Sequence, residues 1–519
     1  MTVHRPGAAL LSASIAALLA FPAIAQAQQA GGEGESATEE PTIITEPDPE
    51  PDPEPTPTPV PKANPNPNPP PEVVDAITQP VVLEPAPPDP EVVETFQFGT
   101  YGRVSAGTDL QSGTPRQVRV VAHPPRLLEG PYAELDFGYL HEVNPTGTTF
   151  YTRATLAFGG DLFHSTGNFD VTWGARNLYL EAQNVLVKGL SFWGGSRMYR
   201  GDDIYLLDFW PLDEQNTVGG GVAFAWSKDG AVKLHVGLNR LDDAFQQQTI
   251  QVPGVDFGTR DVLQVDRQKT VATLRGEQHL TISGDTRLKV IGYGEAHSLP
   301  SGTALNEDQT EKALPSDAGW LAGMELGLYG FSPQSYANLF VRYGADLAAF
   351  DELAIPGDLA QDDTTSGASE LMFGLSANYE TGPVGVLVGS YARYFVDADP
   401  VVYDPDDVWE FAAAVRPAWF LTRHLHLIGE VNVQLQRPNG LYPETQTVEV
   451  PVVWQAALMP SLSLGPGSYA RPQLRFIYAI SFLNESARLR YAPEDIRRER
   501  EVQHFLGIGA EWWFNSSRG

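Results

Sequence analysis

Apolar and polar residues alternate over long stretches of this sequence, and that alternation dictates the kind of fold. From His424 to Gln436 the odd positions are almost all apolar and the even positions are mostly polar. The stretches from Asn338 to Leu347 and from Tyr132 to Tyr139 follow the same pattern. Because successive side chains of a strand point to opposite faces, each stretch predicts a strand with one polar and one apolar face.

Strand length has to decide between two kinds of β protein, because alternation alone fits a soluble sandwich or jelly roll as well as a membrane barrel. Several runs reach ten or more residues, as 424–436 does, whereas strands of soluble proteins are mostly about five or six long. A tilted strand needs about 9 to 11 residues to cross a bilayer. After the N-terminus no stretch approaches the roughly 18 consecutive apolar residues of a spanning helix. We therefore predict an all-β fold, a transmembrane antiparallel β-barrel with lipid outside and water inside.

Composition excludes several classes of function. The 519 residues include 65 acidic and 34 basic side chains, a formal charge of −31, which repels phosphates and excludes nucleic acid as a partner. The complete lack of cysteine excludes a disulfide scaffold, a thiol enzyme and zinc sites built on cysteine. The 49 glycines and 43 prolines, against 5 methionines, favour a turn-rich β protein.

Three segments of different composition define the predicted domains. Residues 1–27 carry His4 and Arg5, an apolar stretch and a small-residue cleavage sequence, which predicts a signal peptide for export. Residues 28–94 are rich in proline and acidic residues, so we expect a disordered, extended periplasmic spacer. It is either a passive linker or an arm that contacts peptidoglycan. Residues 95–519 are predicted to form the barrel, placed in the bacterial outer membrane.

The end of the chain supports the barrel prediction. Glu511-Trp512-Trp513-Phe514 closes the last alternating run. A terminal aromatic strand is typical of outer-membrane barrels, in which it completes the girdle at the membrane interface. The five polar residues that follow are interpreted as a short tail.

Searches for motifs of catalysis or metal binding find nothing. The sequence has no His-Glu-x-x-His, no Gly-x-x-x-x-Gly-Lys, no Gly-x-Ser-x-Gly and no Asp-x-Asp-x-Asp-Gly. His424 and His426 lie two apart on one strand face, but solvated residues of a pore explain them better than a metal site does. The 65 acids give too many candidates to select a pair for glycoside hydrolysis. We expect no catalysis, no cofactor and no metal.

One run, from Trp193 to Trp210, is rich in aromatic, arginine and aspartate residues. Its second half breaks the period of two and leads to Gly219-Gly220-Gly221, interpreted as a turn, so we expect a long loop folded into the barrel. Such a loop offers the two surfaces that a sugar needs. The flat C–H face of a pyranose packs on an aromatic ring, while its hydroxyls hydrogen-bond with guanidinium and carboxylate groups.

The run resembles the constriction loop of maltoporins and related sugar porins over eighteen residues without a gap. The family's first, second and last strands are similar to Phe98–Arg103, Tyr132–Leu135 and Gly507–Phe514. The resemblance implies a trimeric outer-membrane barrel of eighteen strands. In it, oligosaccharides diffuse along a slide of aromatic rings beside a track of charged groups.

The resemblance also assigns the residues that would bind the sugar. The slide would consist of Tyr101, Tyr132 and Trp513, with Trp173 at its mouth and Trp210 in the constriction loop. The track would consist of Arg103, Arg126, Glu134, Arg176, Arg197, Arg200, Asp203 and Asp208. Strand parity agrees for two pairs, because Tyr101 and Arg103, and likewise Tyr132 and Glu134, are two residues apart and share a face.

Two positions depart from the family pattern. Gly201 stands in the place of a track arginine, with Arg200 one position earlier, so that contact is either lost or supplied from a shifted backbone. Trp210 is larger than the tyrosine usual at its position and is expected to narrow the pore.

The sequence thus predicts a channel for facilitated diffusion of sugars, with maltodextrin-like oligosaccharides as substrates and a homotrimer in outer-membrane lipid as the assembly. One alternative is a general porin or a porin for another solute, which would show charged rings without an aromatic path. The other is a secreted β-rich protein, either a glycan-binding protein or a glycoside hydrolase.

Overall fold

The computed structural model describes residues 92–515 apart from 144–145, 162–169, 239–246, 254–258, 266, 306–309, 351–355, 357, 402–403, 405–406 and 443–444. The predicted signal peptide, 1–27, and the predicted spacer up to residue 91 lie outside the described residues and stay predictions. The first strand begins at Val92, three residues before the predicted barrel boundary at Thr95. No helix in the described part of the chain is long and apolar enough to cross a bilayer.

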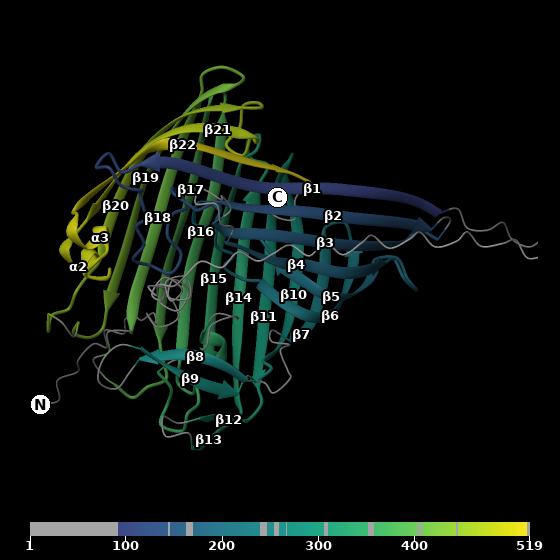
Figure 1. The fold of residues 1–519 in the computed structure, drawn as a ribbon. Coiled ribbons are helices and arrows are strands. Elements are labelled where there is room, and N and C mark those ends of the chain that lie inside the picture. The colour runs from purple at the N-terminus through teal and green to yellow at the C-terminus, as the bar shows by residue number, and fades with distance from the viewer. Residues whose placement is uncertain are drawn as a thin grey trace, which may run out of the picture. The chain divides into compact units, whose positions relative to one another are not determined.

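Eighteen antiparallel strands form one closed sheet (Figure 1). In chain order they are β1 (Val92–Thr108), β2 (Tyr132–Val143), β3 (Thr148–Asp161), β4 (Asp170–Gln183), β5 (Leu190–Arg200), β6 (Glu214–Ser227), β7 (Gly230–Leu238), β10 (Thr270–Ser283), β11 (Thr286–Leu299), β14 (Asp317–Tyr329), β15 (Tyr336–Asp346), β16 (Ser369–Thr381), β17 (Val384–Val396), β18 (Val408–Phe420), β19 (Leu425–Pro438), β20 (Val452–Ser463), β21 (Gln473–Leu483) and β22 (Val502–Phe514). Each strand pairs with the next, and β22 pairs with β1, from Thr100 opposite Phe514 to Thr108 opposite Leu506. The predicted all-β, eighteen-stranded barrel is confirmed.

The long connections between barrel strands carry the remaining elements. A small four-stranded sheet consists of β8 (Gln247–Pro253), β9 (Thr259–Val265), β12 (Gly302–Leu305) and β13 (Glu311–Leu314), which lie together at one end of the barrel (Figure 1). The short helices are η1 (Tyr205–Leu207), η2 (Leu347–Ala349), α2 (Glu485–Arg488) and α3 (Ile496–Glu499).

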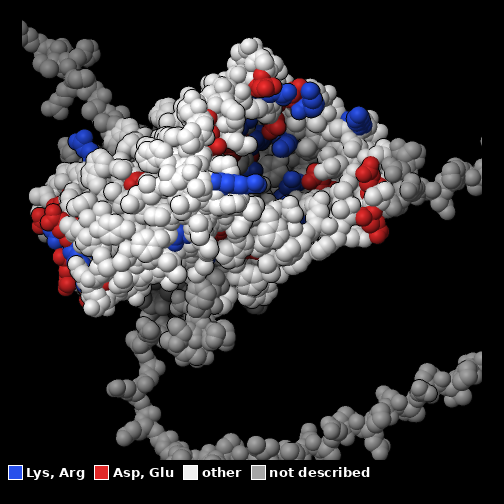
Figure 2. All heavy atoms as spheres, turned by 90° about the horizontal axis from the view of Figure 1, so that it is seen from above, with Lys and Arg blue, Asp and Glu red and all other residues white. Residues whose placement is uncertain are grey.

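Burial along the strands is the reverse of that in a soluble protein. On β18 the charged residues Glu410 and Arg416 are 0% and 6% exposed, whereas Phe411 and Val415 are 39% and 43% exposed. On β19 the polar even-numbered residues predicted from the alternation are likewise buried. Figure 2 shows charged side chains gathered inside a hollow and along part of its edge, whereas much of the remaining surface in this view is uncharged. The polar face therefore lines the interior, and the apolar face meets the lipid.

Two connections fold into the barrel and account for much of this burial. Residues 109–131, between β1 and β2, extend to β19, where the Val120 N–H donates to Gln434 (3.0 Å). Residues 201–213, between β5 and β6, contain η1 and are held by Arg342, which donates to the Pro211 carbonyl (2.9 Å). The two connections also meet each other, since the Arg126 N–H donates to the Leu206 carbonyl (2.9 Å). Together they narrow the interior.

The structure agrees with one part of the prediction for the run 193–210 and corrects another. The first half belongs to β5, and the second half lies in the inward connection, which begins at Gly201. Gly219–Gly221 are not a turn but the middle of β6, where they pair with Trp193–Gly195 of β5. The reason is space: a Cβ at Gly221 would lie 2.3 Å from the Trp193 ring nitrogen. These glycines leave room for a large ring and a close neighbouring backbone.

We predict that Gly219→Ala destabilises the barrel. A Cβ at Gly219 would lie 2.1 Å from the Val236 carbonyl oxygen and 2.5 Å from the Gly237 Cα, both backbone atoms that cannot easily move. Overpacking of this kind typically costs about 1–3 kcal/mol. Denaturant unfolding of the purified barrel measures the loss. The control is Gly292→Ala on β11, where a Cβ meets nothing within 4 Å; equal stability of both variants would contradict the explanation.

Candidate functional site

Six aromatic side chains make a continuous series of ring contacts inside the barrel, which we call the aromatic path. In order they are Tyr132, Tyr101, Trp513, Tyr205, Tyr469 and Tyr336. Neighbouring ring centroids are between 5.1 and 6.4 Å apart. The path is built from β1, β2, β15 and β22, the inward connection at η1 and the β20–β21 connection, so its members are far apart in the sequence.

Strand register brings the first three rings together. Tyr101 on β1 lies opposite Glu134 on β2 and opposite Trp513 on β22. Residues directly opposite each other in antiparallel strands share a face, and Tyr132 is two residues from Glu134 on the same strand. The rings of Tyr101 and Trp513 are nearly parallel, at 14°. Closure of the barrel between its first and last strands is therefore what creates this part of the path.

Charged groups lie directly against the path, and Glu511 is at their centre. Its carboxylate is 4% exposed and pairs with Arg126 (3.4 Å), Arg471 (2.9 Å) and Arg475. Arg126 also donates to the Tyr101 hydroxyl (2.8 Å). Charge-assisted hydrogen bonds of this kind fix the groups in place, so the guanidinium and carboxylate groups are held beside the rings.

A second charged group surrounds Tyr132. Arg176 donates both to the Glu134 carboxylate and to the Tyr132 hydroxyl. The Arg103 guanidinium lies 5.3 Å from the centre of the Tyr132 ring and 3.7 Å from a carboxylate oxygen of Asp208. The strand parity predicted for these residues agrees with their contacts, because Tyr132, Glu134, Arg103 and Arg176 meet on one face of the wall.

A cavity of about 640 Å³ lies along the path. Six of the residues selected from the sequence line it, namely Tyr101, Arg126, Asp203, Asp208, Trp210 and Trp513. The other lining residues are Asp202, Tyr205, His279, Lys289, Tyr329, Tyr336, Asn338 and Tyr469. The volume is within the usual range of small-molecule sites, about 300–1,000 Å³. The lining combines aromatic rings with carboxylate and cationic groups.

Arg200 and Arg197 have contacts of their own. The Arg200 guanidinium lies over the Trp210 ring, 3.7 Å from its centre, and pairs with Glu214 (2.7 Å). Arg197 pairs with Glu181 (3.1 Å). Arg197 belongs to a separate aromatic group that contains Tyr179, Trp193 and Tyr199. The structure therefore does not bring Arg197 into the cavity.

The family pattern has an arginine at the position of Gly201. In this chain the guanidinium next to Gly201 belongs to Arg275, on another strand. An ideal Cβ at Gly201 would lie 2.5 Å from a terminal nitrogen of Arg275, on β10, and 2.0 Å from a carboxylate oxygen of Asp213. Arg275 and Asp213 form a buried ion pair. The space that a side chain at 201 would enter is already occupied by this pair, so the glycine and Arg275 fit each other.

Trp173 lies apart from the aromatic path. It is on β4, directly opposite Phe158 of β3, which in turn lies opposite Ala133 of β2. Ala133 faces away from the neighbouring Tyr132, so Trp173 points to the outer side of the wall, and its side chain is 68% exposed. In this chain it does not join the aromatic path.

Sequence reasoning missed several members of the site. Glu511 could have been found, because it lies two residues before Trp513 and so shares its strand face. Tyr205 stands in the run that drew attention but was not selected. Tyr469 and Arg471 follow a glycine-rich connection that has no periodic pattern, so nothing in the local sequence points them to the interior.

A closed barrel of long strands, apolar outside and charged inside, defines an outer-membrane channel. The comparisons agree. The model of the LamB porin family matches residues 96–514, and the chain belongs to that family. The predicted resemblance to sugar porins and the location in the bacterial outer membrane are confirmed. The family is one of channels rather than of enzymes.

Individual relatives are distant. A maltoporin of Photobacterium profundum is 21% identical over 458 residues, which cover 81% of this chain and 94% of that protein. Pseudomonas aeruginosa OccK3 (OpdO) is 11% identical with a TM-score of 0.39, over 81% of this chain and 95% of that chain. A BenF-like porin from Pseudomonas fluorescens Pf-5 is 12% identical, with a TM-score of 0.39, over 82% and 98%.

We predict that Glu511→Gln makes the channel less selective for cations. The change removes one negative charge beside three arginines, so the pore becomes more favourable to anions, and the cation-to-anion permeability ratio should fall by about twofold or more. The zero-current potential across a planar bilayer in a salt gradient measures the ratio. The control is Glu485→Gln on α2, outside the barrel wall. An unchanged potential for Glu511→Gln would place this carboxylate outside the ion pathway.

Proposed function

We propose that the protein is a channel for the facilitated diffusion of sugars, with linear oligosaccharides such as maltodextrins as substrates. The observation that carries the proposal is the aromatic path, six rings in series with charged groups held against them. A pore that sorts solutes by size and charge alone has no need of such a series. The maltoporin among the relatives of the chain supports the same substrate class.

The arrangement explains how a sugar would move. A ring that is open to the pore would present an apolar face to the C–H face of a pyranose, while the adjacent guanidinium and carboxylate groups would exchange hydrogen bonds with its hydroxyls. Because several rings lie in series, a chain of sugars can leave one ring as it reaches the next. Modest binding at many sites allows release, which one strong site would prevent.

The assembly and export of the protein are part of the proposal. On the resemblance to sugar porins we propose a homotrimer in the outer membrane. Residues 1–27 would direct export, and residues 28–94 would form a periplasmic spacer that either is passive or contacts peptidoglycan. Native mass spectrometry of the detergent-solubilised protein tests the trimer directly.

A general porin is the alternative that the proposal must exclude. Liposome swelling separates the two, because a sugar channel passes maltodextrins faster than peptides of equal size, whereas a general porin passes both at rates set by size and charge. Equal rates for the two solutes would favour the general porin.

We predict that Tyr132→Ala weakens the block of ion current by maltodextrins and leaves the open-channel current similar or larger. Loss of one stacking contact, worth about 0.5–1.5 kcal/mol, should raise the half-blocking concentration about 2- to 10-fold. Current noise and block in planar bilayers provide the measurement. The matched control is Tyr139→Ala on the same strand, whose ring faces outward and is 36% exposed. A block equal to that of the unmodified protein would remove Tyr132 from the sugar pathway.

A further inference from the structure

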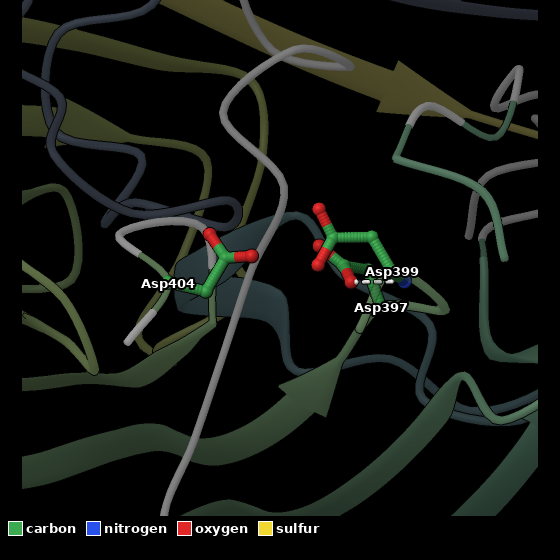
Figure 3. Close-up of side chains that lie close together, drawn as sticks. All are labelled: Asp397, Asp399 and Asp404. Carbon is green, nitrogen blue, oxygen red and sulfur yellow. Dashed lines mark hydrogen bonds between the residues drawn. The ribbon is translucent and has the colours of Figure 1, made fainter. Parts of the chain in front are cut away.

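Three carboxylates lie close together in the connection between β17 and β18. They belong to Asp397, which directly follows the last residue of β17, and to Asp399 and Asp404 (Figure 3). One carboxylate oxygen from each residue can be chosen so that all three lie within 4.8 Å of one another. The cluster is outside the barrel wall, and it is separate from the aromatic path.

The hydrogen bonds of Asp397 give a second, independent observation. Its side chain is buried, at 3% exposure. One carboxylate oxygen, Oδ1, accepts the N–H of Asp399 (2.9 Å). The other, Oδ2, is buried and has no hydrogen-bond partner among the residues that the structure describes. A buried acceptor without a partner destabilises the fold, and does so more strongly when it is charged, so this oxygen calls for a partner.

The charge around Asp397 points to the kind of partner. Within the described ranges, neither Asp397 nor Asp399 forms an ion pair with a lysine or arginine. The carboxylates of Asp397, Asp399 and Asp404 lie close together, and Asp397 and Asp404 are buried. Like charges are therefore held together in a buried place, which a cation would stabilise.

We propose that Asp397, Asp399 and Asp404 bind a divalent cation, and that this cation is Ca²⁺. Calcium takes six to eight oxygen ligands at about 2.3–2.6 Å, so oxygens on opposite sides of the ion are up to about 4.6–5.2 Å apart. Magnesium demands near-ideal octahedral geometry, keeps several waters and is usually held by only one or two carboxylates. Three carboxylate oxygens within 4.8 Å of one another therefore suit calcium better, and water and backbone carbonyls would complete its shell.

The position of the site indicates what the ion does. The Ala398 N–H, between two of the ligands, donates to the Asp358 carbonyl of the neighbouring β15–β16 connection (3.3 Å). On the other side, the Asn439 N–H donates to the Asp407 carbonyl (2.7 Å). An ion held by Asp397, Asp399 and Asp404 therefore fixes a connection that touches both of its neighbours, and it stiffens this part of the barrel rim.

Calcium binding to the whole protein tests the proposal. The full chain is refolded in detergent, so that no lipopolysaccharide carries ions, and is freed of metal with a chelator. Equilibrium dialysis with ⁴⁵Ca²⁺ should then find one site per chain, with a Kd on the order of 10⁻⁴ to 10⁻³ M, as in extracellular calcium modules. The double variant Asp397→Asn/Asp399→Asn should bind at least tenfold more weakly. The control is Asp362→Asn, an exposed acid of the β15–β16 connection, which should bind as the unmodified protein does.

Each other outcome overturns the proposal or a part of it. Equal binding by the double variant and the unmodified protein, both with normal open-channel conductance, would show that the calcium is held elsewhere. Displacement of ⁴⁵Ca²⁺ by an equal concentration of Mg²⁺ would overturn the choice of calcium. If the double variant does not assemble, the single variant Asp397→Asn, which keeps the side-chain shape, is compared in the same way.

Discussion

Every backbone N–H and C=O inside a bilayer must find a partner within the protein, and the rest of this structure depends on that constraint. A sheet satisfies it only when it closes, because an open edge would leave a row of unpaired groups in lipid. Here closure is the pairing of β1 with β22. The same pairing sets Tyr101 beside Trp513 and Glu511, so the strand contact that makes the barrel possible also builds the centre of the site.

Closure also explains why the interior is so charged and yet so ordered. The wall must offer apolar residues to lipid on one face, which leaves every second position free for polar groups. The two inward connections bury these groups, and a buried charge is stable only when it is paired. Arginine and carboxylate side chains accordingly form networks, such as Glu370 with Arg342 and Arg393, while Glu511 lies among three arginines. A rigid polar lining results, and it holds each hydrogen-bonding group beside a ring.

The sequence predicts the strands of the barrel wall better than it predicts the residues that meet inside the barrel and in its connections. Period two over 424–436 is enough to assign β19 and its polar face, because strand geometry leaves no other choice. Gly219–Gly221 were mistaken for a turn because glycine is typical both of turns and of places where a large ring or a backbone comes close. The path is harder still to predict, since Tyr205, Tyr469 and Tyr336 meet only after the barrel has closed. The acidic cluster had no motif at all, because Asp397, Asp399 and Asp404 do not have the spacing of a known calcium loop.

The departures from the family pattern show how a site persists while its residues change. A guanidinium stands next to position 201, yet it comes from β10 instead of from the inward connection, and Gly201 is the residue small enough to admit it. The Arg200 guanidinium lies 3.7 Å from the centre of the Trp210 ring. It covers one face of this larger ring, so the ring presents less free surface to the pore. On the proposed function, the pore needs a ring and a charge at a given place. Because a closed barrel brings many strands to that place, residues distant in the sequence can supply them, and alignment of a single motif then identifies the site only in part.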